Sequence, residues 1–213
     1  TAARGRRGRA WANPPGNFAA SLVLRPDGPP AHAALRSFVA ALALRDALAV
    51  ATGRADALAL KWPNDVLLSG GKVAGILLES VGAAGRVDGL IIGIGVNLAE
   101  APDAAGLGPD AVPPVSLAGE TGATVAPEAF LDLLAPAYDR WEHAFRHAGF
   151  APIRSAWLSH AARLGDTITA RTTSQTLTGR FEDLAADGCL VLGLEKGTRK
   201  ISAGEVFFRE GER

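Results

Sequence analysis

A basic, glycine-rich stretch at residues 3–11, ARGRRGRAW, has residue types that could perform chemistry. Its four arginines carry guanidinium groups, which bind phosphate or carboxylate through paired hydrogen bonds. Its glycines let the main chain approach a ligand closely, and Trp11 offers a flat ring for stacking. The stretch indicates a phosphate clamp with a stacking platform, or else a flexible basic arm that binds a nucleic acid backbone. The arginines are Arg4, Arg6, Arg7 and Arg9.

The segment 61–79, KWPNDVLLSGGKVAGILLE, places polar residues between apolar runs. Asp65 follows a strand that Pro63 stops, and its carboxylate suits a hard cation such as Mg²⁺. Lys72 follows the tight turn SGG and precedes an apolar strand, so it can direct an ammonium group into a pocket. The same residues also fit a plainer interpretation, in which Asn64 and Asp65 form a turn and Lys72 lies in solvent at a sheet edge.

The third stretch, Gly93-Ile94-Gly95-Val96-Asn97, ends an apolar run. Glycines at alternate positions of a buried strand leave one face of that strand without side chains. Such a face lets a ligand approach the backbone. Tight packing of a helix explains the same pattern, so this signal is weak on its own.

Composition and charge limit the classes of protein that can carry these motifs. The 213 residues are 48% hydrophobic and 21% charged, which is typical of a soluble globular protein of one large or two modest domains. Lysines plus arginines number 22, as do the acidic residues, so no global field attracts nucleic acid or an anionic membrane. The single cysteine, Cys189, excludes an internal disulfide and a thiolate metal cluster. The apolar run 90–96 is too short to cross a bilayer.

Apolar spacing and turn residues predict the elements that position the motifs. Up to about residue 162, strands and helices predict a mixed, largely antiparallel sheet with helices on one side. We expect strands at 18–25 and 58–62, a hairpin of 65–68 and 72–80, a buried strand at 90–98, a loop at 101–114, and helices at 31–50, 127–148 and 152–162.

After Gly165 the pattern changes to short strands separated by turns. Strands at this spacing predict a small β-barrel, which makes the fold class α+β. We expect residues 1–162 to form the first domain and residues 163–213 the second. The strands expected in the second domain are 167–171, 176–184, 189–194 and 199–202.

In their order and spacing the three motifs resemble those of the biotin–protein ligases. ARGRRGRAW is similar to the family's adenylate loop, usually GRGRxGRxW, with Ala3 in place of a glycine. KWPND followed by GKVAGIL is similar to the family's central signature, and GIGVN to its third motif. Residues 201–206, ISAGEV, resemble part of the SH3-like barrel at the end of the family's chains. The resemblance covers essentially the whole chain.

The resemblance implies an ATP-dependent reaction in two steps. The family joins biotin to ATP, giving biotinyl-5′-adenylate and pyrophosphate, and then transfers biotin to one lysine of a carrier domain in a carboxylase. By analogy, the partner is the biotin carboxyl carrier protein of acetyl-CoA carboxylase or of a related carboxylase. The resemblance also implies use of Mg²⁺, a cytoplasmic enzyme, a homodimer with the arginine-rich loop near its interface, and no binding of this chain to membranes or nucleic acid.

The resemblance assigns roles to particular residues. Arg6 matches the main catalytic arginine, and Lys72 matches the lysine that reaches the reacting carboxyl and phosphoryl oxygens. Trp11 matches the tryptophan that packs against adenine, and Asp65 matches a polar residue near Mg²⁺. The other matching positions are Arg4, Gly5 and Arg9 in the loop, Asn64 near the phosphates, Gly75, Ile76, Gly93 and Gly95 at the ligand pocket, and Asn97 near the nucleotide.

This chemistry requires no serine–histidine or cysteine–histidine nucleophile. We therefore interpret His32, His143, His147 and Cys189, which lie outside every motif, as structural or surface residues. The sequence assigns no role to His160 and identifies no base for the transfer step.

One departure and three alternatives remain. In the family, a strand and helix before the arginine-rich loop carry a Ser/Thr-Thr-Asn-type biotin motif, and a glutamine lies just upstream of the loop. Because Thr1 begins at this loop, we expect a segment upstream of it and an incomplete biotin pocket without that segment.

A lipoate or octanoate ligase or transferase shares the fold class and the acyl-adenylate chemistry. The remaining alternatives are a basic-arm nucleic-acid-binding module and a truncated, inactive domain.

Overall fold

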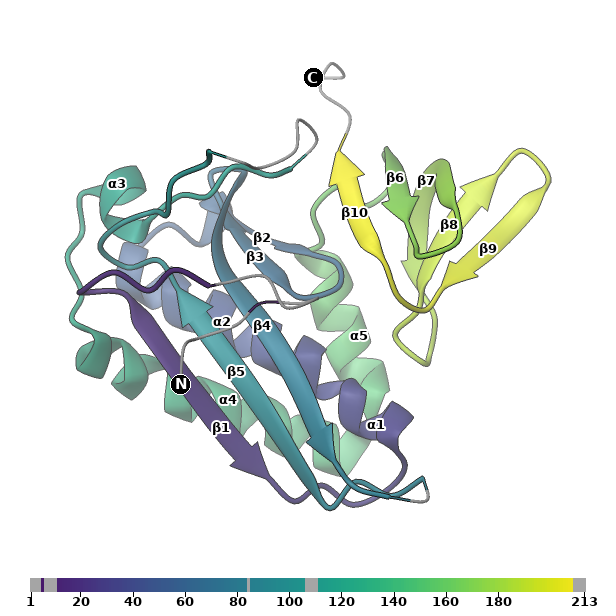
Figure 1. The fold of residues 1–213 in the computed structure, drawn as a ribbon, viewed down its shortest axis with the longest axis horizontal. Helices are drawn as coiled ribbons and strands as arrows, with labels where there is room; N and C mark the ends of the chain where they lie inside the picture. The colour runs from purple at the N-terminus through teal and green to yellow at the C-terminus, as the bar shows by residue number, and fades with distance from the viewer. Residues whose placement is uncertain (1–4, 6–10, 84, 106–110, 209–213) are drawn as a thin grey trace.

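The computed structural model describes residues 5, 11–83, 85–105 and 111–208. Its first part is a five-stranded antiparallel sheet with strand order β1-β5-β4-β3-β2, covered on one face by helices (Figure 1). The largely antiparallel sheet expected from the sequence is therefore observed. The strands are β1 Phe18–Leu24, β2 Leu58–Lys61, β3 Asp65–Leu68, β4 Gly71–Val81 and β5 Gly89–Val96.

The helix α2, Arg36–Thr52, is the centre of the first part because it packs against the sheet as well as against α4 and α5. Residues 38–44 are all buried, so the side chains of this central part point in all directions into the protein. The single helix expected at 31–50 is divided at Leu35, and the short helix α3 follows a segment expected to be a loop. The other helices are α1 Pro30–Ala34, α3 Leu117–Thr121, α4 Pro127–Ala148, α5 Phe150–Ser159 and a 3₁₀ turn at Ala55–Ala57.

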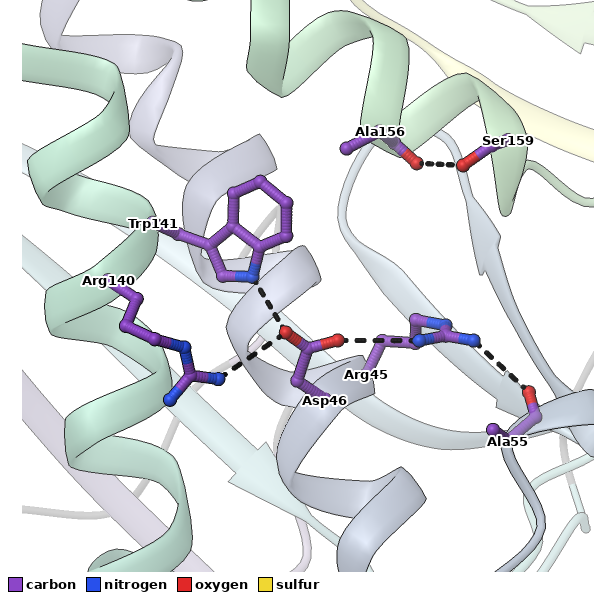
Figure 2. Close-up of polar contacts among 7 residues, drawn as sticks. All are labelled: Arg45, Asp46, Ala55, Arg140, Trp141, Ala156 and Ser159. Atoms are coloured by element: carbon purple, nitrogen blue, oxygen red, sulfur yellow. Dashed lines mark hydrogen bonds and ion pairs between the residues drawn. The ribbon is translucent and has the colours of Figure 1, made fainter. Parts of the chain in front are cut away.

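A polar network around Asp46 joins α2 to α4 within this helical layer (Figure 2). Trp141 Nε1 donates a hydrogen bond of 2.9 Å to Asp46 Oδ2, and the Arg140 guanidinium lies 3.7 Å from the same oxygen. Arg45 contacts the other carboxylate oxygen at 3.3 Å and also donates to the Ala55 carbonyl. The network therefore links α2 to α4 and to the 3₁₀ turn in the layer that covers the sheet.

The second part is another five-stranded antiparallel sheet, with strand order β10-β6-β7-β8-β9. The sequence predicted four of its strands, and the fifth, β10, pairs with β6 and completes the sheet. The small β domain expected from the sequence is therefore present. Its strands are β6 Thr167–Arg171, β7 Thr176–Leu184, β8 Leu190–Leu194, β9 Gly197–Ile201 and β10 Glu205–Phe208.

The turn between β7 and β8 attaches the second sheet to the first part. Trp62, at the end of β2, donates a buried hydrogen bond of 3.1 Å from Nε1 to the Gly188 carbonyl. Gly188 has a φ of +78°, and a Cβ added to it would lie 2.8 Å from the Phe38 ring of α2. Arg154 of α5 also pairs with Asp183 of β7. These contacts hold the second sheet against the helical layer.

Replacing Gly188 with alanine tests this attachment. We expect Gly188→Ala to lower the free energy of unfolding by about 2–5 kcal/mol, because the left-handed backbone costs a non-glycine residue about 1–2 kcal/mol and overpacking adds about 1–3 kcal/mol. Urea denaturation measures the loss.

The matched control is Gly197→Ala, because Gly197 also has a positive φ, +96°, but no atom lies within 4 Å of the added Cβ. This variant should show only the backbone cost of about 1–2 kcal/mol. Equal losses in the two variants would mean that the turn at Gly188 does not pack tightly on α2.

Candidate functional site

The open face of the first sheet forms the floor of a cavity of about 690 Å³. Along β5, Ile92 and Val96 belong to the hydrophobic core, whereas Ile91, Gly93 and Gly95 line the cavity. This alternation follows from the two-residue period of a strand, which directs successive side chains to opposite faces. The volume is in the range of pockets that bind small molecules.

The Asp65 carboxylate lies between two lysines, one of which is its register partner. Asp65 of β3 lies opposite Lys61 of β2 and opposite Gly75 of β4. Lys72 Nζ is 2.6 Å from Asp65 Oδ1, and Lys61 Nζ is 3.8 Å from Asp65 Oδ2. The Lys72 side chain is 30% exposed, against 10% for Lys61. The cavity wall thus carries one carboxylate between two ammonium groups, and Lys72 is the more accessible cation.

The two asparagines of the motifs hold backbone in place around this group. The Asn64 side chain donates to the Ile76 carbonyl, and Ile76 N donates 3.0 Å to the Asn64 carbonyl. Asn97, 1% exposed, donates 3.0 Å from Nδ2 to the Val115 carbonyl. Asn97 Oδ1 is buried and has no hydrogen-bond partner within the described part of the chain. Both residues line the cavity, so they connect its wall to the backbone of β4 and of the segment before α3.

The Trp11 indole lies on the glycine positions of the sheet. A Cβ added to Gly95 would lie 2.6 Å from Trp11 Cζ2 and Nε1, and one added to Gly75 would lie 3.1 Å from Cζ3. The Lys72 ammonium is 5.7 Å from the centre of the Trp11 ring. Trp11 Nε1 is buried without a hydrogen-bond partner among the residues that the structure describes. The aromatic ring and the bare strand face predicted from the sequence are therefore in direct contact with each other.

The contact predicts that Gly95→Ala displaces the Trp11 ring. The added methyl group overlaps the indole, so the ring must move toward solvent, and we expect the tryptophan fluorescence emission to shift to longer wavelength. The same substitution in a Trp11→Phe background should produce no shift, which assigns the change to Trp11 among the four tryptophans of the chain.

Gly93→Ala is the matched control on the same strand face. Its added Cβ would lie 3.5 Å from the nearest atom, the Leu77 carbonyl oxygen, which is an ordinary contact. An equal shift in both glycine variants, or none in Gly95→Ala, would contradict the position of Trp11 on Gly75 and Gly95. With Gly93 these residues form the bare part of the cavity floor, the glycine floor.

The second sheet and a surface segment supply cavity walls that the motifs did not reveal. Glu205, Val206 and Phe207 of β10 line the cavity, as do Pro102 and Asp103. The resemblance pointed to the segment around Glu205 as part of the barrel but gave it no place in the site. A short strand that pairs only with β6 has little local signal, because its partner lies more than thirty residues away in sequence.

The structure brings most of the predicted site residues together. Trp11, Asn64, Asp65, Lys72, Gly75, Ile76, Gly93, Gly95 and Asn97 all line the cavity. Gly5 of the arginine-rich stretch also lines it. The predictions for Arg4, Arg6 and Arg9 concern residues that lie outside the described ranges.

Metal binding by Asp65 remains a prediction. The described residues contain no group of three or more histidine, cysteine, aspartate or glutamate side chains that could hold a metal ion. Asp65 offers a single carboxylate, and Lys72 already occupies one of its oxygens. This donor set does not fit a resident metal. It fits an Mg²⁺ ion that arrives on a nucleotide, since that ion takes most of its ligands from phosphate and water.

The four histidines all lie within the described ranges, and none of them lines the cavity. His32 stacks on Phe145 with ring centres 4.7 Å apart, and His143 stacks on His147. Burial lowers the pKa of His160, and the nearby Arg45 lowers it further. Cys189 is a partly buried free thiol outside the cavity.

The environment of Cys189 predicts an unreactive thiol. Burial, with a smaller contribution from Asp187, raises the pKa of Cys189 to about 11. Because the thiolate is the reactive form, we expect alkylation by iodoacetamide at pH 8 to be much slower than that of an ordinary cysteine, and to accelerate as pH rises toward 11. Mass spectrometry of the labelled protein measures the rate, with glutathione as the reference thiol. A rate at pH 8 equal to that of glutathione would contradict the raised pKa.

None of the helices in the described ranges has the length and apolar character required to span a membrane.

Two family models match the chain. Residues 1–97 match the biotin/lipoate A/B protein ligase family, and residues 164–209 match the biotin protein ligase C-terminal domain. The matches identify the class of the protein: the chain has the sequence features of a biotin or lipoate ligase.

Individual relatives agree with the family models. The chain is 59% identical over 207 residues to a biotin–[acetyl-CoA-carboxylase] ligase of Paracoccus denitrificans, covering 97% of this chain and 86% of that protein. It is 32% identical to the bifunctional ligase/repressor BirA of Bacillus subtilis, of which it spans 63%. A solved structure of biotin protein ligase from Aquifex aeolicus in complex with biotin and ATP superposes with a TM-score of 0.81 at 26% identity, covering 98% of this chain and 84% of that one. The chain therefore belongs to the biotin protein ligases, and the predicted family and α+β fold are confirmed.

Proposed function

We propose that this chain activates biotin with ATP and transfers it to a lysine of a biotin carboxyl carrier protein. In the first step a biotin carboxylate oxygen attacks the α-phosphorus of ATP, forming biotinyl-5′-AMP and releasing pyrophosphate. In the second step the carrier lysine amine attacks the biotinyl carbonyl carbon, AMP leaves, and the amine loses a proton. The observation that carries this proposal is the Lys72 ammonium group beside the glycine floor of the cavity.

Lys72 has the charge that the first step requires. Two anions, a carboxylate and a phosphate, must approach each other, and a cation that spans them offsets their repulsion and stabilises the charge of the transition state. Lys72 lines the cavity, and its present partner Asp65 is a carboxylate that a substrate anion can replace. Arg4, Arg6 and Arg9 would add positive charge from the loop. The position of Gly5 in the cavity wall supports their approach to the ligand.

Trp11 and biotin would use the same floor in turn. Gly75, Gly93 and Gly95 match positions of the biotin pocket, and the indole lies against Gly75 and Gly95. Biotin binding would therefore move Trp11 off these glycines, after which the ring can pack against adenine. Asn64, Ile76 and Asn97 would border the nucleotide and biotin from β4 and β5. Asn97 Oδ1, buried and without a partner in the described ranges, would accept a hydrogen bond there.

Several further properties belong to the same proposal. The carrier would be that of acetyl-CoA carboxylase or a related carboxylase, which the name of the Paracoccus relative supports. We further propose a cytoplasmic enzyme that forms a homodimer, uses Mg²⁺ with ATP, and does not bind nucleic acid or membranes through this chain. The division into domains 1–162 and 163–213 is supported by the start of the second family model at residue 164.

The proposal predicts biotin-dependent exchange of radiolabelled pyrophosphate into ATP in the presence of Mg²⁺. Lys72→Met should lower the kcat of exchange by about 100-fold or more, because it removes a preorganised charge that stabilises the transition state. Arg6→Ala tests the main catalytic arginine in the same assay, and we expect a loss of similar size.

Arg86→Ala is the matched control, since the Arg86 side chain is 81% exposed and does not line the cavity. It should leave exchange within about twofold of the unmodified chain. Exchange with lipoate or octanoate in place of biotin would move the assignment to the lipoate branch of the family. Exchange unchanged by Lys72→Met would remove Lys72 from the chemistry.

A further inference from the structure

Lys61 lies at a junction between the cavity, Asp65 and the second sheet. It ends β2, is 8% exposed and lines the cavity. Its ammonium is 3.8 Å from Asp65 Oδ2 and 5.7 Å from the centre of the Phe208 ring of β10. The pairing of Lys61 with Asp65 across the β2–β3 hairpin fixes this arrangement, because the two residues are register partners. Lys61 thus lies near one oxygen of Asp65, and Lys72 lies near the other.

The proposed function takes positive charge away from the Asp65 carboxylate, because it assigns Lys72 to the substrate. A Lys72 ammonium that turns toward the reacting oxygens weakens its 2.6 Å pair with the carboxylate. Once Lys72 turns to the substrate, Asp65 keeps a charge in a largely enclosed position, its side chain being 13% exposed, next to incoming phosphates. A poorly solvated charge without a counterion is costly, so a cation that stays at Asp65 favours the release of Lys72, and Lys61 is there before any Mg²⁺ arrives with ATP.

We propose that Lys61 is a positioning residue that holds the Asp65 carboxylate while Lys72 leaves it for the reacting carboxyl and phosphoryl oxygens. The inference rests on the proposed function, because it takes the role of Lys72 from there. Lys61 acts through Asp65 and does not touch the reacting atoms. Without Lys61, Asp65 retains Lys72 more strongly, and the loaded enzyme reaches the reactive arrangement less often.

The test is a double-mutant cycle between Lys61 and Asp65, measured by biotin-dependent ATP–pyrophosphate exchange. Lys61→Met should lower kcat by about tenfold and change the KM values for biotin and ATP by less than about threefold. In an Asp65→Asn background no carboxylate retains Lys72, so Lys61→Met should then change kcat by less than about twofold. A purely structural role of Lys61 would give the same factor in both backgrounds, and that result would overturn the proposal.

Lys61→Arg is a second test of the proposal, for the case that exchange by Asp65→Asn is too slow to measure. Arginine keeps the positive charge and reaches the carboxylate, so it should recover most of the activity lost in Lys61→Met. An arginine variant as slow as the methionine variant would overturn the proposal. Thermal denaturation of each variant establishes that it is folded before its rates are compared.

Arg163→Met is the matched control for the contact with the second sheet. The Arg163 guanidinium lies 5.6 Å from the centre of the same Phe208 ring, pairs with Asp166 and does not line the cavity. Its removal should leave kcat within about twofold. A loss equal to that of Lys61→Met would assign the effect to the Phe208 contact and overturn the role through Asp65.

Exchange by the unmodified chain tests the proposed function separately from the role of Lys61. If it shows no biotin-dependent exchange, the proposed function fails before Lys61 is compared. If it exchanges, and Lys61→Met exchanges at the same rate, the ligase reaction stands and only the role of Lys61 fails.

Discussion

The ion pairing of Asp65 is the interaction on which the arrangement of the site depends. Asp65 begins β3 between two antiparallel strands; the register places Lys61 of β2 opposite it, and Lys72 of β4 reaches its other oxygen through the side chain. A carboxylate in this largely enclosed position requires such partners. The turn between β2 and β3 is held by Asn64, which bonds to Ile76 through both its side chain and its backbone. The charge pattern of the site is therefore built into the sheet.

The glycine floor imposes a second constraint, which concerns space. The absence of side chains at Gly75 and Gly95 makes a flat surface on the sheet, and the Trp11 ring covers it. A flat apolar surface that accepts an indole also suits another compact apolar or ring-bearing group, since both gain by leaving water. The surface that the indole covers is therefore shaped for a compact flat group. Lys72 borders this surface because it lies close to the Trp11 ring.

The second sheet is a structural part of the site as well as a separate fold unit. Its turn at Gly188 packs on α2 and accepts the Trp62 hydrogen bond, while β10 reaches the cavity with Glu205 and Phe207. The helix α2 packs against both the first sheet and this turn. Its contacts include β2 and β3, the hairpin that carries Asp65.

The sequence by itself determined the elements with strong local periodicity and the family. The strand at 65–68 and the helix at 127–148 have the predicted bounds, because alternation or helical spacing of apolar residues is a local property. The motifs also identified some of the residues that line the cavity from β3, β4 and β5, but not Leu77, Glu79 or Ile91. Only the tertiary structure decided the division of the first helix at Leu35, the strand β10, the place of Trp11 on Gly95, and the position of Lys61 between Asp65 and Phe208. These features depend on contacts between residues far apart in the chain, and the distance between such residues is set by how the two sheets and the helices pack.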